Sequence, residues 1–82
     1  MNISQEKPNV KYIQREKVFN HLDRLGSITT KDAFEIYGIT RLSAKIYELR
    51  KMGLIIDTVR ERGFNRFGEP TNYARYYLRR DI

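Results

Sequence analysis

Residues 41–52 combine a high density of basic side chains with the spacing of a helix. Four basic residues stand there against one acid, Glu48, and the difference is half of the formal net charge of +6. Arginine and lysine can donate hydrogen bonds to guanine O6 and N7, and both can bind backbone phosphates. The segment is therefore a candidate nucleic-acid contact. Its basic residues are Arg41, Lys45, Arg50 and Lys51.

The apolar residues of this segment predict which of its side chains are exposed. Leu42, Ile46 and Leu49 recur at helical spacing and form a narrow stripe that must pack inward. The side chains on and beside the opposite face include Glu48, which would accept from a cytosine amino group or tether a neighbouring cation. The alternative is an ordinary solvated face in which Glu48 pairs with Lys45 or Arg41. We predict DNA contacts from Arg41, Ser43, Ala44, Lys45, Tyr47, Glu48 and Lys51.

A second cationic element follows at residues 60–72. Arg60 and Arg62 lead into a loop rich in glycine, asparagine and proline, and Arg66 lies at its centre. Guanidinium groups on such a loop can bind phosphates or enter a narrow minor groove, where the negative potential is enhanced. Phe64 and Phe67 flank Arg66. We favour a small folded-back cluster for the two rings over a wedge against a sugar or base step.

Five secondary-structure elements are needed to position these side chains. Helical periodicity begins near Tyr12 and ends before Gly26, and a second, short helix ends before Gly38. Residues after Gly53 become β-branched and aromatic with a period near two, which is typical of strands. Residues 27–28 are expected to be an extended link. The expected elements are helices over 12–25, 30–37 and 41–52, and strands over 54–62 and 71–78.

This order of elements predicts a winged helix-turn-helix domain. Two helices joined by a tight glycine-containing turn, followed by a hairpin, give a mainly α fold with a small β-hairpin, an α+β class of three helices and a two-stranded wing. Residues 1–11 are expected to be a flexible arm, 12–78 the domain and 79–82 a short charged tail. On the return strand, Tyr73, Arg75 and Tyr77 share a face whose role the sequence leaves open.

Composition excludes several other classes of protein. The chain has 82 residues and no cysteine, so it is one domain without disulfides or thiolate zinc sites. No apolar run is long enough to cross a bilayer, and no glycine-rich phosphate loop is present. His21 is the only histidine and is expected to be a partly buried helix residue. We expect no metal, no cofactor and no enzymatic activity.

The stretch 26–53 resembles a family of small helix-turn-helix domains that is common in phage and prophage proteins. That family carries Gly-Ser-Ile-Thr, a short helix ending in glycine, and then Arg-Leu-Ser-Ala-Arg-Ile-Tyr-Asp-Leu-Arg. Residues 41–50 of this chain read Arg-Leu-Ser-Ala-Lys-Ile-Tyr-Glu-Leu-Arg, with lysine for arginine and glutamate for aspartate. The resemblance extends over roughly 14–78. It implies a winged helix-turn-helix fold, duplex DNA binding and a mobile-element origin in a bacterial cell.

The leading hypothesis is a sequence-preferring double-stranded DNA-binding protein that regulates phage or prophage transcription. The helix at about 41–52 would enter the major groove, and the wing at about 60–72 would lie on backbone or minor groove. An excisionase-like DNA-bending factor and a protein that inhibits a host protein are the alternatives. The sequence also leaves open a homodimer and a recombinase or host factor as partner. The expected location is the bacterial cytoplasm, at the nucleoid, without membrane contact.

Overall fold

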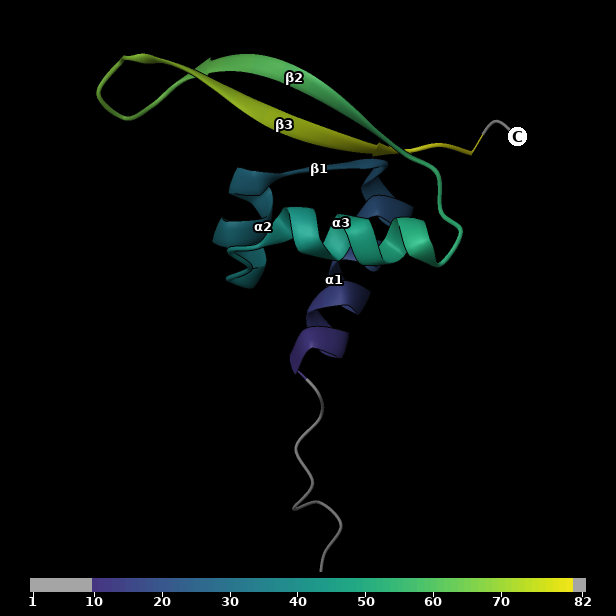
Figure 1. The fold of residues 1–82 in the computed structure, drawn as a ribbon. Helices are drawn as coiled ribbons and strands as arrows, with labels where there is room; N and C mark the ends of the chain where they lie inside the picture. Colours follow the sequence, from purple (N-terminus) through teal and green to yellow (C-terminus); the bar gives the residue numbers. More distant parts are fainter. Residues whose placement is uncertain (1–9, 81–82) are drawn as a thin grey trace, which may run out of the picture.

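Three helices pack together below a small antiparallel sheet, in the view of Figure 1. The structure is a computed structural model, and it describes residues 10–80. The two long strands extend past the helices as a hairpin, whose tip lies at the opposite end of the sheet from the end of β3. In chain order the elements are α1 (Val10–Leu25), β1 (Ser27–Thr29), α2 (Thr30–Tyr37), α3 (Leu42–Lys51), β2 (Ile56–Phe64) and β3 (Pro70–Leu78).

Local signals explain the bounds of α2. The Thr29 side chain accepts from the Asp32 backbone N–H at 3.0 Å, and the Asp32 carboxylate accepts from the Thr29 N–H at 3.1 Å. This reciprocal pair satisfies donors that a helix start leaves open, and Gly38 ends α2 in the left-handed conformation with φ 69°. Both α2 and α3 lie within one residue of the predicted ranges. α1 begins at Val10, two residues before the predicted start and inside the expected arm, whose residues 1–9 lie outside the described ones.

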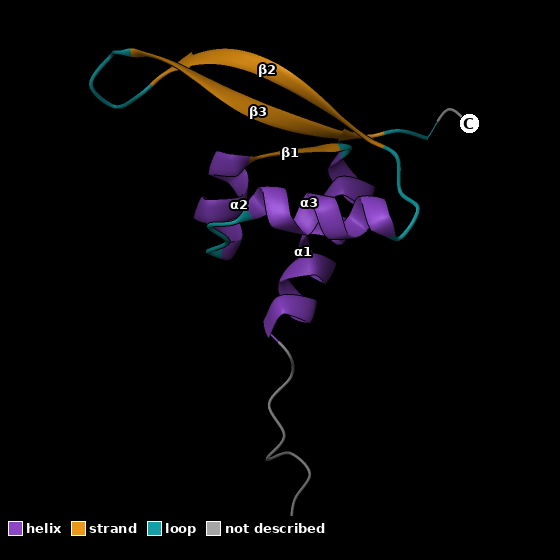
Figure 2. Ribbon diagram, in the orientation of Figure 1, coloured by secondary structure: helices purple, strands orange, loops and turns teal. Residues whose placement is uncertain are grey.

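The sheet has three strands in the order β1-β3-β2, shown in orange in Figure 2. The predicted link at residues 27–28 is wrong, because β1 pairs antiparallel with β3. Ile28 lies opposite Tyr76, and Ser27 lies opposite Tyr77. The third strand fixes the hairpin to the helices, since β1 leads directly into α2. Only residues 75–77 of β3 have a β1 partner, so the outer hairpin is a two-stranded ribbon.

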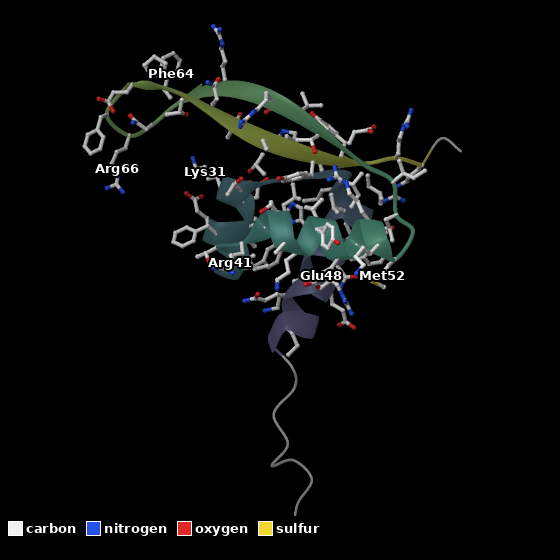
Figure 3. All side chains as sticks on the ribbon, in the orientation of Figure 1. Lys31, Arg41, Glu48, Met52, Phe64 and Arg66 are labelled. Carbon is white, nitrogen blue, oxygen red and sulfur yellow. The ribbon has the colours of Figure 1, made fainter. Side chains whose placement is uncertain are left out.

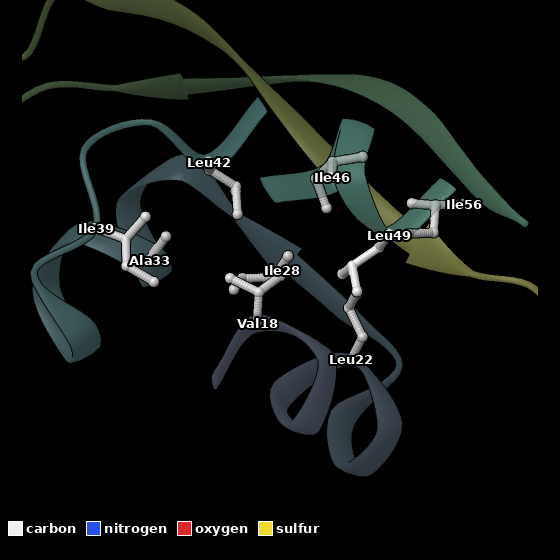
Figure 4. Close-up of a cluster of buried hydrophobic side chains, with 9 residues drawn as sticks. All are labelled: Val18, Leu22, Ile28, Ala33, Ile39, Leu42, Ile46, Leu49 and Ile56. Carbon is white, nitrogen blue, oxygen red and sulfur yellow. The ribbon is translucent and has the colours of Figure 1, made fainter. Parts of the chain in front are cut away.

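The core lies where the three helices meet the inner face of the sheet (Figure 4). Ile56 enters it from β2, and Tyr76 and Leu78 of β3 pack against its edge. Strand alternation places these three residues on the face of the sheet that meets the helices. The nine buried hydrophobic side chains are Val18, Leu22, Ile28, Ala33, Ile39, Leu42, Ile46, Leu49 and Ile56.

His21 joins α1 to α2 at the margin of this core. It is 4% exposed, its Nδ1 is hydrogen-bonded to the Tyr37 hydroxyl at 2.7 Å, and the two rings meet edge to face. Burial lowers the pKa of His21, while the charge of Asp32 raises this pKa and that of Arg24 lowers it further. The structure thus places His21 inside the fold, with a polar partner and no other histidine.

His21 is expected to make the fold less stable in mild acid. A lowered pKa in the folded state means that the unfolded chain binds the proton more tightly, so stability is lost as the pH falls below about 6.5. Chemical unfolding measured from pH 8 to pH 5 should show this slope in the parent. His21→Gln should flatten the slope over the same range. An equal slope in both proteins would assign the pH dependence to other groups.

The end of β3 is tied back to α1. The Arg80 guanidinium forms an ion pair with the Asp23 carboxylate at 3.2 Å and also donates to the backbone carbonyls of Leu22 and Asp23. Arg79 pairs with Asp57 of β2 at 3.4 Å. Two residues of the predicted charged tail therefore pack on the domain. Residues 81–82 lie outside the described ones.

Candidate nucleic-acid interface

One face of α3 is open to solvent along the whole helix. Ser43, Ala44 and Lys51 are exposed, and Tyr47 is 62% exposed. The Lys51 ammonium lies 5.5 Å from the centre of the Tyr47 ring, so the aromatic ring and the cation form one unit. Arg41 occupies the N-cap position and is exposed. Five residues of the predicted contact set therefore lie where a bound helix would present them.

Lys45 is not on this face. It is only 7% exposed, and it lies among the inward positions of α3 with Leu42 and Ile46. The sequence-based placement of Lys45 beside the exposed face is wrong. Such low exposure is typical of long basic side chains that bury their methylene groups.

Glu48 is also turned away from the solvent face. Its carboxylate pairs with Arg15 of α1, with 3.5 Å between Oε1 and Nη1, and its side chain is 17% exposed. The prediction that Glu48 lies at the centre of the exposed face is wrong, because α1 packs along that flank of α3. The acid that a phosphate backbone would repel is thus withdrawn toward α1, and since Lys45 is withdrawn as well, the open face keeps Arg41 and Lys51 as its cations.

Arg50 fixes the hairpin relative to α3. Its Nε and Nη2 donate to the Ile56 carbonyl at 3.0 and 2.5 Å, and Nη2 also donates to Thr58 Oγ1 at 2.9 Å. A single guanidinium therefore joins the end of the helix to the start of β2. Arg50 sets the spacing between the two cationic elements, and its charge is used inside the molecule.

The hairpin carries its arginines on different sides. Arg60 and Arg62 lie on the same face of β2 as Ile56, are exposed, and have no carboxylate partner among residues 10–80. Arg66 lies at the tip, which we define as residues 64–69, with its guanidinium carbon 5.9 Å from the centre of the Phe67 ring. The three predicted wing arginines are therefore exposed, but they do not form one flat patch.

A cleft of about 610 Å³ separates the tip from α2. Arg66 lines it from the hairpin, and Lys31 lines it from the first turn of α2. Lys31 and Arg66 lie at the same end of the molecule as Arg41 (Figure 3). Sequence reasoning missed Lys31, because its approach to the hairpin depends on β1. The reciprocal pair of Thr29 and Asp32, a capping box, marks the start of α2. It therefore indicates that Lys31 lies in the first turn of this helix.

The two phenylalanines of the tip are open to solvent. Phe64 is 76% exposed and Phe67 is 78% exposed, so the favoured folded-back cluster is wrong. Asn65 stabilises the loop in its place. Its side-chain oxygen accepts from the backbone N–H groups of Phe67 at 2.9 Å and Glu69 at 3.0 Å. The loop therefore needs no aromatic cluster to hold its shape.

On the other face of β3, Glu61 joins Arg75 and Tyr77. Arg75 Nε donates to the Glu61 carboxylate at 3.0 Å, and the Tyr77 hydroxyl donates to the same group at 3.3 Å. The Arg75 hydrogen bond lowers the pKa of Glu61 and in turn raises the pKa of Arg75. Arg75 also donates to Ser27 Oγ at 3.2 Å, which joins β1 to the hairpin. These groups stiffen the sheet beneath the tip.

Gly63 also contributes to the packing of the hairpin beneath the tip. A Cβ atom at this position would lie 2.9 Å from Cε1 of Tyr73, so the ring of Tyr73 lies across β2 where only glycine leaves room. The ring lines the cleft below the tip. A glycine inside a strand thus marks a packing contact and not a break in the hairpin.

The fold has three helices, a small antiparallel sheet and a hairpin that projects beside the exposed face of α3. Comparison with protein families agrees with this arrangement. Residues 13–81 match the family described as a winged helix-turn-helix domain. The chain belongs to this family. In its terms α3 is the recognition helix and the β2-β3 hairpin is the wing. A search of curated proteins and a search of solved structures each found no match.

Family membership supports DNA binding by this winged helix-turn-helix domain. The wing projects beside the recognition helix, as groove binding by such a domain requires. Within residues 10–80, no three histidine, aspartate or glutamate side chains are grouped to hold a metal ion. Over the same residues, no helix is both long and apolar enough to cross a membrane.

Proposed function

We propose that this protein binds duplex DNA with a sequence preference and acts by occupying its site. The observation that carries the proposal is the open face of α3, which presents Arg41, Tyr47 and Lys51. Beside it lies a wing whose Arg60 and Arg62 have no carboxylate partner among residues 10–80. A major groove about 12 Å wide admits one helix with its side chains. The wing would then lie on the adjacent backbone or minor groove. No catalytic step is part of this function.

The proposed contacts differ from the set expected from sequence. On α3 they are Arg41, Ser43, Ala44, Tyr47 and Lys51, while Lys45 and Glu48 are left out because of their burial and their contact with α1. Arg41 and Ser43 lie at the amino end of α3, which in helix-turn-helix domains usually approaches the bases. On the wing the proposed contacts are Arg60, Arg62 and Arg66.

We further propose that the protein is a transcriptional regulator of phage or prophage origin that acts at the nucleoid of a bacterial cell. The resemblance of residues 26–53 to phage-type domains supports this assignment. One module of this size buries roughly 600–1,000 Å² on DNA, which seldom gives strong specificity. We therefore expect a homodimer or tandem sites. A bound motif with two-fold symmetry would support the dimer.

Selection of bound fragments from a random duplex library tests the sequence preference. The parent should enrich a motif, whereas Arg41→Ala combined with Lys51→Ala should weaken binding to that motif by about 10- to 100-fold and reduce its enrichment. Lys45→Met is the matched control, because it removes a charge from the same helix at a buried position. Its affinity should stay within about threefold of the parent.

Two results would contradict the proposal. Failure of the parent to bind any duplex at about 50 mM salt would remove DNA as the partner, since the electrostatic contribution is already large there. A stronger loss for Lys45→Met than for the Arg41 and Lys51 variant, with both proteins folded, would move the contact surface to the other side of α3. In the first case a pull-down for an acidic protein partner becomes the next experiment.

A further inference from the structure

The wing tip exposes more apolar surface than its loop requires. The side chains of Phe64 and Phe67 are each more than three-quarters exposed, and neither ring enters the core. Large apolar side chains are less favourable in water than in a buried position. Since hydrogen bonds made by Asn65 already close the loop, the rings contribute little to its shape. They are available to a partner.

Hydrogen bonds hold the backbone of the loop that carries Phe67 and follows Phe64. Asn65 Nδ2 donates to Glu69 Oε1 at 2.9 Å, its backbone N–H donates to the Glu69 carbonyl at 3.0 Å, and Gly68 N–H donates to the Asn65 carbonyl at 3.0 Å. Together with the two bonds to Asn65 Oδ1, these contacts hold the chain from Asn65 to Glu69. A rigid loop loses little entropy on binding, so the rings are presented at low cost.

Cations lie on both sides of this tip. On one side, Arg60 and Arg62 lie on the face of β2 that carries Ile56. On the other side is the cleft, which Gly63 and Tyr73 line from the hairpin. Lys31 and Arg66 lie in this cleft. The same cleft also holds the acids Asp32 and Glu35, and Glu69 in the tip accepts from Asn65. The shape is therefore a narrow ribbon with apolar rings at its end and basic side chains on each side.

A minor groove has the complementary shape, because a phosphate backbone runs along each of its two walls. A membrane or an acidic protein surface would meet only one side of the ribbon, and the cations on the other side would then face solvent. Apolar wedges such as phenylalanine enter minor grooves, partly unstack a base step and bend the duplex by about 20–90°. Arginine is favoured there by the negative potential of a narrow groove.

We propose that the wing tip inserts into the minor groove of duplex DNA, with Phe64 and Phe67 wedged against a base step. The inference rests on the proposed function and adds the residues, the groove and a consequence, which is a bend in the bound DNA. Arg62 faces one wall of the groove, and Arg66 with Lys31 faces the other. Site occupancy and DNA bending are then performed by separate elements, α3 and the tip.

The test compares parent and Phe64→Ala plus Phe67→Ala on the selected duplex. Bend angle is measured by energy transfer between dyes at the duplex ends, and affinity is measured across a salt series. The alanine variant should lose most of the bend and about 5- to 100-fold in affinity, while its salt slope stays unchanged because no charge is removed. Leucine at both positions should restore much of the bend, since it keeps an apolar wedge.

Phe34→Ala is the matched control, because this ring of α2 is 59% exposed and lies outside the tip. It should bend and bind DNA as the parent does. Thermal unfolding should be alike in all variants, since the substituted rings lie outside the core. A parent-like bend and affinity in the alanine variant would overturn the inference while leaving the proposed function intact.

Two further outcomes also decide against the wedge. If the alanine substitutions weaken binding to single-stranded DNA or to phosphatidylserine vesicles, but not to duplex, the rings serve another ligand. If the parent binds no duplex at about 50 mM salt, the proposed function and this inference fail together. A bend that disappears with the rings and returns with leucine supports insertion.

Discussion

Replacing Arg60, Arg62 and Arg66 with glutamine is expected to weaken duplex binding by about 100- to 1,000-fold at ~100 mM salt. Each exposed guanidinium can form a charge-assisted hydrogen bond to phosphate, worth about 1.5–3 kcal/mol before solvent screening. Each phosphate contact also contributes about 0.9 to the slope of log affinity against log salt. The slope should therefore become shallower by up to about three units in a salt titration of the triple variant.

The matched control removes the same number of charges from the other end of the molecule. Arg24, Arg79 and Arg80 lie at the end of α1 and after β3, far from the tip along the sheet (Figure 1). Glutamine at these three positions should leave the slope close to that of the parent. Thermal unfolding of each variant separates a binding effect from a folding effect, because Arg79 and Arg80 form ion pairs with Asp57 and Asp23.

If both triple variants lose affinity equally, net charge and not the wing explains the binding. The structure favours the wing, since Arg60 and Arg62 have no carboxylate partner among the described residues, whereas the control arginines Arg79 and Arg80 do. An exposed cation that already has an acid nearby offers less to a phosphate. The comparison thus tests the arrangement of charge directly.

Elements with local signals could be predicted from the sequence. The capping box of Thr29 and Asp32 and the left-handed Gly38 bound α2, and both signals involve residues four or fewer apart. The short strand β1 carries no such signal. Three residues cannot show a period, and the pairing of Ile28 with Tyr76 joins positions far apart in the chain. Only the folded chain shows that this segment is a strand.

The position of Lys45 differs from the one that its charge predicts. It follows Leu42 by three residues, which at about 100° per residue places it only about 60° from Leu42 around the helix axis. By angle alone it belongs beside the apolar stripe. Lysine is seldom buried, so the residue type predicts an exposed position for Lys45. In the structure Lys45 is buried, and α1 packs against α3.

At the tip, apolar side chains expected to be covered are exposed instead. Apolar rings usually avoid water, which favours folding back of Phe64 and Phe67, but both rings are exposed and a cleft separates the tip from α2. Asn65 could be recognised as a turn residue from sequence. The sequence does not show that the Asn65 side chain accepts hydrogen bonds from both Phe67 and Glu69. These bonds hold the loop without an aromatic cluster.

Ile46→Ala is expected to lower the free energy of unfolding by about 2–5 kcal/mol. Ile46 is 1% exposed and lies within the buried cluster on the inward side of α3 (Figure 4), so truncation leaves a cavity as well as lost apolar contact. A domain of this size has a total stability of roughly 4–12 kcal/mol. The variant should therefore lose a large share of this stability, which chemical and thermal unfolding will measure.

A graded series distinguishes the cavity from a general effect of altering α3. Ile46→Val should cost about 0.5–1.5 kcal/mol, whereas Ser43→Ala, on the exposed face of the same helix, should stay within about 0.5 kcal/mol of the parent. Equal costs for Ile46→Ala and Ser43→Ala would contradict the packing of α3 described here. Since Ile46 and the exposed Tyr47 are neighbours on one helix, the same packing that stabilises the fold also aims the proposed DNA contacts. Loss of Ile46 should therefore weaken DNA binding in proportion to the unfolded fraction, and stabilising co-solvent should restore both together.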